Sequence, residues 1–115
     1  MPGSPAEQGR RAIELTDPGD PRLSDFRNLT DADARPDRRG IVIAEGVNVV
    51  QRLIGSRCSV RAVLGIADRI EALAPVLAGT DAPVYVVDKW LLSDVVGFRV
   101  TRGVLAAADR PAPID

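Results

Sequence analysis

A short segment in the middle of the chain combines residue types that contact phosphates and nucleobases. It reads Ala-Glu-Gly-Val-Asn-Val-Val-Gln-Arg over residues 44–52. Gly46 allows a tight turn, and a helix beginning after it would offer the free N–H groups of its first turn to an anion. Asn48 and Arg52 are four residues apart, so they share one helix face. This pattern suits contact with RNA; the alternative is an ordinary strand-to-helix turn with a solvated polar face.

A second basic segment, Gly-Phe-Arg-Val-Thr-Arg-Gly, covers residues 97–103. Arg99 and Arg102 would hold phosphates and Phe98 would stack on an unpaired base, unless its ring is buried in the core. We expect this loop to meet the one after Glu45, because loops at the same ends of parallel strands converge. The candidate RNA-binding residues are Glu45, Gly46, Asn48, Arg52, Phe98, Arg99, Thr101 and Arg102.

Three arginines, Arg52, Arg57 and Arg61, follow one another with no acidic residue between them. They support an alternative prediction, a protein-interaction domain that binds an acidic partner. Arg69 lies on the next predicted helix, and we expect it to stand away from the RNA-binding surface.

The composition excludes several classes of enzyme. The chain of 115 residues has a net charge of −1 and contains no His and one Cys. Catalytic triads, Cys-His pairs and His- or Cys-cluster metal sites are therefore excluded. Glycine-rich nucleotide-binding loops are absent, because Gly40, Gly46 and Gly55 are too far apart. We expect no catalytic residue, cofactor site or metal site in this chain. No apolar stretch approaches the roughly 20 residues of a membrane span, which favours a cytoplasmic protein.

Continuous apolar runs alternate with segments of helical periodicity after Gly40. Runs of this kind are typical of strands buried on both faces, and the 3.6-residue period indicates helices. The order β-α-β-α-β-α-β predicts a three-layer α/β/α sandwich with a four-stranded, mainly parallel sheet over residues 40–109. The predicted strands are 41–44, 60–66, 83–87 and 103–108, and the intervening helices end before Gly55, Gly79 and Gly97.

Local signals predict how the helices begin and pack. Asp68 with Glu71 predicts a capping box, Asp88 predicts an N-cap, and Pro75 should kink or shorten its helix. Tyr85 and Trp90 lie within core elements and are expected to pack there.

The N-terminal third contains few apolar residues. We predict a flexible arm over residues 1–16, with at most a docked turn around Ile13 and Leu15. A short helix beginning near Pro21 would pack Leu23 and Phe26 against the body, and residues 31–39 are expected to form an exposed loop.

Three segments together resemble the N-terminal RNA substrate-binding domain of SpoU/TrmH-type RNA ribose 2′-O-methyltransferases, which include the thiostrepton-resistance-type enzymes of actinobacteria. The segments are DPRLSDFR (20–27), IVIAEG (41–46) and VVGFRVTRGVLA (95–106). The resemblance implies a fold similar to that of kink-turn-binding ribosomal proteins, which recognise RNA through a Gly-x-Asn-x-x-x-Lys helix start. Gly46, Asn48 and Arg52 match this motif, with Arg in place of Lys.

Two positions depart from the family pattern. Val49 stands where kink-turn binders usually carry an acid, and many family members carry a His near Thr101. Both positions lie in the two segments that are expected to bind RNA.

The resemblance also implies which part of the chain has which role. Residues 17–110 would be the RNA substrate-binding domain, residues 1–16 an arm and residues 111–115 the start of a Pro-rich interdomain linker. In the family, methyl transfer takes place in a following domain that binds S-adenosylmethionine and dimerises, and none of its motifs occurs here. The implied function is recognition of structured, ribosomal RNA for a 2′-O-methyltransferase by a monomeric domain that is not catalytic by itself.

Overall fold

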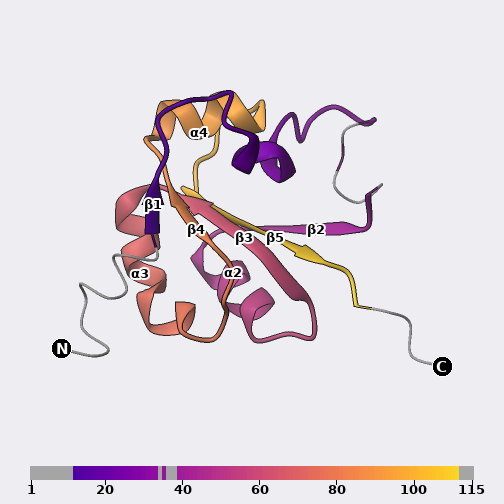
Figure 1. The fold of residues 1–115 in the computed structure, drawn as a ribbon, viewed down its shortest axis with the longest axis vertical. Helices are drawn as coiled ribbons and strands as arrows, with labels where there is room; N and C mark the ends of the chain where they lie inside the picture. The colour runs from indigo at the N-terminus through magenta and orange to yellow at the C-terminus, as the bar shows by residue number, and fades with distance from the viewer. Residues whose placement is uncertain (1–11, 34, 36–38, 112–115) are drawn as a thin grey trace.

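A five-stranded mixed sheet lies at the centre of the molecule (Figure 1). The structure, a computed structural model, describes residues 12–33, 35 and 39–111. The strand order is β1-β4-β3-β5-β2. Strand β4 is parallel to both β1 and β3, whereas β5 is antiparallel to both β3 and β2. The strands are β1 (Ala12–Glu14), β2 (Ile41–Glu45), β3 (Ser59–Gly65), β4 (Val84–Val86) and β5 (Val104–Asp109).

Helices cover both faces of this sheet, which confirms the predicted three-layer α/β/α fold. Helices α2 (Val47–Ile54) and α3 (Ala67–Leu77) pack on one face. Helix α4 (Lys89–Val96) and the 3₁₀ helix η1 (Pro21–Phe26) pack on the other. Alternate residues of each strand enter the two cores, as the two-residue period of a strand requires. The largest fully buried side chain, Phe26 of η1, belongs to the core between the sheet and α4.

The number of strands differs from the prediction because β1 was not expected. This three-residue strand pairs with β4 in register Ile13 to Tyr85, and the N–H of Leu15 donates to the Val86 carbonyl at 2.9 Å. Leu15 is buried in the core beside Tyr85. The segment assigned to the flexible arm therefore ends in a strand, and residues 1–11 of that arm lie outside the described residues.

The direction of β5 determines which loops meet. Helix α4 crosses the top of the molecule in Figure 1 and does not return the chain to the opposite end of the sheet. Gly97 ends α4 in the left-handed conformation (φ 93°), and the chain then enters β5 at Val104, opposite Gly65 at the end of β3. The loop before β5 consequently lies at the carboxyl end of β2 and β3. In a parallel arrangement this loop would have lain at the other end.

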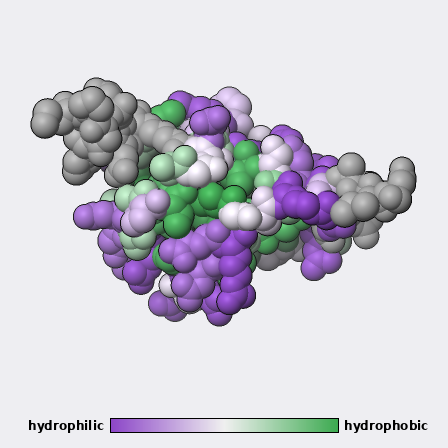
Figure 2. Space-filling model, turned by 90° about the horizontal axis from the view of Figure 1, so that it is seen from below, coloured by the Kyte–Doolittle hydropathy of each residue, from purple (hydrophilic) through white to green (hydrophobic). Residues whose placement is uncertain are grey.

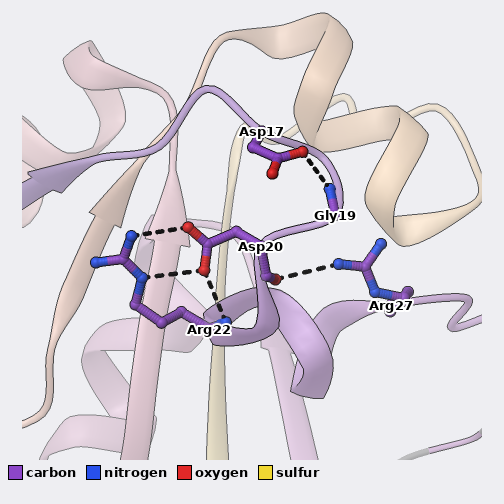
Figure 3. Close-up of polar contacts among 5 residues, drawn as sticks. All are labelled: Asp17, Gly19, Asp20, Arg22 and Arg27. Atoms are coloured by element: carbon purple, nitrogen blue, oxygen red, sulfur yellow. Dashed lines mark hydrogen bonds and ion pairs between the residues drawn. The ribbon is translucent and has the colours of Figure 1, made fainter.

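Polar contacts hold the entrance of η1 in place (Figure 3). Asp20 is the N-cap, and its carboxylate accepts hydrogen bonds from the Arg22 backbone N–H at 2.9 Å and from the Arg22 guanidinium. These bonds lower the pKa of Asp20 to about 2. Arg27 donates to the Asp20 carbonyl at 3.2 Å, and Asp17 accepts from the Gly19 N–H. The predicted helix at Pro21 is thus confirmed.

Arg61 joins three elements through a bulge in β3. Val60 is paired with Ala108 and Ala62 with Ala107, so Arg61 is an extra residue in its strand. The bulge directs its guanidinium to Asp25 of η1 at 2.8 Å and to Asp109 of β5 at 3.0 Å. These contacts raise the pKa of Arg61. The side chain is therefore engaged in holding η1 against the sheet.

The predictions about how the helices begin and end were confirmed in part. The Asp88 carboxylate accepts from the Leu91 N–H at 2.8 Å, as predicted for an N-cap. Helix α3 instead begins at Ala67, so Asp68 falls within its first turn and caps nothing. Pro75 lies near the end of α3, which continues to Leu77.

The prediction that both aromatic residues pack in the core is half right. Tyr85 is buried, but Trp90 is 75% exposed. Helix α4 turns Leu92, Val95 and Val96 towards the sheet, and Trp90, two residues before Leu92, points to the opposite side.

The side of the molecule away from α4, which is at the bottom in Figure 1, has a partly apolar surface. Figure 2 shows an apolar strip there between hydrophilic side chains. A depression at the start of β3 has a mainly polar lining, which includes Ser56, Ser59, Arg61, Thr80 and Asp81 beside Ile54, Cys58, Val60 and Pro83.

Candidate functional site

Three chain segments meet at the carboxyl ends of β2 and β3, and two glycines allow the approach. The N–H of Gly46 donates to the Val104 carbonyl and that of Ile66 to the Gly103 carbonyl, each at 2.9 Å. Gly46 (φ 97°) and Gly103 (φ 76°) both have backbone angles that favour glycine. A Cβ at Gly46 would lie 3.0 Å from Arg102 Cδ, and one at Gly103 would lie 2.9 Å from Arg69 Cγ. The loop before β5 is therefore held against the starts of α2 and α3.

An open depression of about 330 Å³ lies where these segments meet. Asn48, Thr101, Arg69 and Arg102 are exposed, so their polar groups are accessible to a ligand. Helix α2 has no side-chain cap and no acidic residue in its first turn, so its first free N–H groups are available to an acceptor. We call this site the arginine depression; its lining residues are Gly46, Val47, Asn48, Val49, Arg69, Thr101 and Arg102.

Arg69 and Arg102 differ from Arg22 and Arg61 in whether they form ion pairs. Arg22 and Arg61 form ion pairs with carboxylates. Within the part of the chain that the structure describes, neither Arg69 nor Arg102 forms one. A guanidinium with no carboxylate partner can donate in bidentate fashion to a phosphate. The depression therefore presents positive charge that the fold itself does not neutralise.

The predicted site residues fall into separate groups. Gly46, Asn48, Thr101 and Arg102 come together in the arginine depression. Arg52 is exposed on α2, one helical turn beyond Asn48, and does not line it. The expectation that the two loops converge is confirmed in outcome, but its reason was wrong, because β5 is antiparallel.

Other predicted residues lie elsewhere. Phe98 is 37% exposed and, with Glu45, lines a different depression beside β2. Arg99 is exposed and lines neither of the two. We call the second depression the β2 groove; it is lined by Leu29, Arg35, Ile41, Val42, Ile43, Glu45, Phe98, Leu105 and Arg110.

Arg69 is a site residue that sequence reasoning placed incorrectly. It was expected to stand away from the RNA-binding surface, whereas it lines the arginine depression beside Arg102. The position of Arg69 at this edge of the sheet could have been predicted from the sequence. Residues that follow the carboxyl ends of parallel strands gather at one edge of a sheet, and Arg69 follows β3 as Asn48 follows β2.

The described residues were also searched for metal sites and for membrane-spanning helices. No group of three or more potential metal ligands occurs within residues 12–33, 35 and 39–111. Over the same ranges, no helix has the length and apolar character needed to cross a bilayer.

Comparison with known proteins relates the chain to RNA methyltransferases, although no family model matches it. It is 47% identical over 104 residues to the uncharacterized tRNA/rRNA methyltransferase Rv0881 of Mycobacterium tuberculosis and to its counterpart Mb0905 of Mycobacterium bovis. The similarity to rRNA and tRNA methyltransferases is confirmed. The match covers 87% of this chain but only 36% of those proteins, so the chain spans about a third of their length.

Solved structures show the same fold. An rRNA methyltransferase from Sinorhizobium meliloti superposes with a TM-score of 0.67 over 90% of this chain and 39% of that one, at 17% identity. Its AdoMet-bound form gives 0.63, and an RNA 2′-O ribose methyltransferase gives 0.60. The predicted α/β architecture is thus found within part of larger RNA methyltransferases.

The lining of the arginine depression does not fit S-adenosylmethionine, the methyl donor that the similarity implies. Its sulfonium is a cation, and Arg69 and Arg102 in the arginine depression would repel it. The lining of the depression offers no carboxylate to oppose that charge or to accept from the ribose hydroxyls. The donor set suits an anion.

Proposed function

We propose that this chain recognises RNA for an rRNA 2′-O-methyltransferase and binds it through the arginine depression. The observation that carries the proposal is the convergence of two arginines without a described carboxylate partner in one depression. Arg69 and Arg102 stand together without a described carboxylate partner, whereas Arg61, elsewhere on the surface, is paired with two. Phosphate contacts from arginine and lysine supply essentially all of the non-specific affinity of proteins for nucleic acids and a large share of the specific affinity.

The geometry suggests a role for each part of the site. Arg69 and Arg102 would each donate to a phosphate, and the Asn48 amide, which both donates and accepts, would contact a base edge or a 2′-hydroxyl. Arg52 would meet the backbone one helical turn further along α2. Thr101 would add a hydroxyl to the rim of the depression.

The rest of the activity is proposed for the parts of the relatives that this chain does not span. S-adenosylmethionine would be held there, and methyl transfer to the ribose would occur there. The rRNA named for the structural neighbours is the substrate we propose, and the cytoplasm, where bacterial ribosomal RNA is found, is the proposed compartment.

The alternative of a domain that binds an acidic protein has less support. It relied on Arg52, Arg57 and Arg61 as one basic patch, but Arg61 is engaged by Asp25 and Asp109. Two exposed arginines then remain of the three.

Binding of a structured ribosomal RNA fragment, measured by fluorescence anisotropy at several salt concentrations, tests the proposal. Affinity should fall steeply with salt, because phosphate contacts release counterions. The double variant Arg69→Gln/Arg102→Gln keeps the packing of both side-chain stems but removes both charges. We expect about tenfold weaker binding or more, and a salt slope lower by about two units.

Arg57→Gln is the matched control, since Arg57 is exposed but lies in the loop before β3, at the other end of that strand. It should change affinity little. Equal losses in the control and the double variant would show diffuse charge attraction and would refute the proposed site.

A further inference from the structure

Strand β2 forms one edge of the sheet, and its register shows which backbone groups are free. Gly46 and Val104 are joined by an N–H to carbonyl bond at one end, and Arg110 and Gly40 at the other. Hydrogen-bonded pairs alternate in an antiparallel ladder, so Val42 and Ala44 also turn their backbone groups towards β5. The N–H and C=O groups of the alternate residues therefore point away from the sheet; these residues are Ile41, Ile43 and Glu45.

No described strand pairs with this outer edge, because β2 is terminal in the strand order. Unpaired edges are templates for another strand, and proteins usually protect them with lysine, proline or a bulge. The edge from Ile41 to Glu45 contains no lysine or proline, and its register with β5 is regular. Among the described strands, none pairs with this outer edge.

The β2 groove runs beside this edge and combines apolar and charged side chains. Ile43 and Leu29 are half-buried, and Phe98 is 37% exposed. Arg110, bonded to Gly40, stands at the amino end of β2, whereas Glu45 is its last residue. Opposite charges thus lie at opposite ends of one strand.

We propose that a second copy of this chain docks on the β2 edge through antiparallel pairing of the two β2 strands. With Ile43 opposite Ile43 of the second copy, every outward-facing backbone group meets a partner, since Ile41 lies opposite Glu45. The same two-fold arrangement brings Glu45 of each copy to the amino end of β2 of the other. There Arg110 follows Asp109, which is the register partner of Ile41 and is already paired with Arg61. Such self-complementarity is what an interface between identical surfaces requires. It replaces the expectation of a monomer.

The short length of β2 limits the area that this dimer interface can bury and therefore its affinity. A single five-residue strand with its flanking side chains buries less than a standard interface of about 1,600 Å². The dimer should therefore be weak and concentration-dependent. It does not depend on RNA binding, since the arginine depression and the β2 groove share no lining residue.

Sedimentation equilibrium of the 115-residue chain over a wide range of concentrations tests the proposal. The wild-type chain should show reversible dimerisation. Ile43→Lys places a charge at the centre of the pairing and should weaken dimerisation about tenfold or more. The matched control is Ile13→Lys, because Ile13 is an exposed isoleucine of the other edge strand, β1. That variant should dimerise as the wild type does.

A charge exchange provides a test that does not alter the strand centre. Glu45→Arg should weaken dimerisation through repulsion from Arg110, and Glu45→Arg/Arg110→Glu should restore it. A wild-type chain that remains monomeric at the highest concentration would overturn the proposal. Weakening by Ile13→Lys equal to that by Ile43→Lys would also overturn it, as would a double charge variant no better than Glu45→Arg.

Discussion

Gly46 and Gly103 determine, at the scale of single residues, how closely the loop before β5 approaches α2 and α3. Both have positive φ angles, and each would place a Cβ about 3 Å from an arginine side chain of the depression. The glycines therefore shape the site, and the arginines supply its charge.

Replacing Gly46 should destabilise the protein and disturb the site together. Gly46→Ala forces a Cβ into a strained backbone conformation and against Arg102. We expect a loss of about 1–3 kcal/mol in the free energy of unfolding, measured by urea denaturation. Gly55→Ala is the control, because Gly55 has φ −82° and a Cβ there would have no contact closer than 3.7 Å. Similar losses for both variants would contradict this account of Gly46.

Asp20 should make folding stability depend on pH in acid. Its pKa is lowered to about 2 by hydrogen bonds from Arg22. A carboxylate with a depressed folded-state pKa contributes stability above its unfolded pKa of about 3.9, and the contribution is lost as pH falls through the folded pKa.

Asp20→Asn keeps an acceptor for the Arg22 N–H but cannot titrate. Between pH 4 and pH 2 the variant should therefore lose less stability than the wild type, as measured by the urea midpoint. Asp17→Asn serves as the control, since Asp17 accepts from the Gly19 N–H but forms no ion pair with a described residue. Identical pH profiles for wild type and Asp20→Asn would show that the Arg22 contact does not contribute.

Residue types were a better guide to the site than residue positions. Asn48 and Arg102 were predicted to come together, because the loops that carry them were expected at the same ends of parallel strands. Arg69 was misplaced although it follows β3 as Asn48 follows β2. The arrival of Arg102 at the same edge depends on the antiparallel direction of β5, and no local pattern encodes that direction.

At the scale of elements, the helices and the strands β2 to β5 were predictable and β1 was not. The apolar run at Ile41 identified β2, and Val50 with Leu53 identified α2. Strand β1 has only three residues, two of them exposed, so it shows no alternation. It forms because β4, some seventy residues away, offers a partner edge.

The orientation of α4 predicts opposite effects for two neighbouring side chains. Leu92 is 1% exposed and Trp90 is 75% exposed. Leu92→Ala should lower the free energy of unfolding by about 2–5 kcal/mol, because it leaves a cavity. Trp90→Ala should change it by about 0.5 kcal/mol or less, as is usual for surface residues. Thermal or urea denaturation measures both, and a large loss for Trp90→Ala would mean that α4 is rotated.

At the scale of the whole molecule, two parts of the surface differ. The carboxyl ends of β2 and β3 carry Arg69 and Arg102 around an open depression. The side away from α4, seen from below, presents an apolar strip between hydrophilic side chains (Figure 2). The relatives are about three times as long as the matched region.

Backbone amide NMR during titration with a structured ribosomal RNA fragment tests the central claim most directly, because it locates the bound RNA without any substitution. The account predicts the largest shift changes at residues 46–49, at Arg69 and at residues 101–103, with smaller changes at Arg52. Amides of the loop before β3 should change little. Shift changes concentrated in that loop or on the exposed side of α4, with the depression unaffected, would contradict the account.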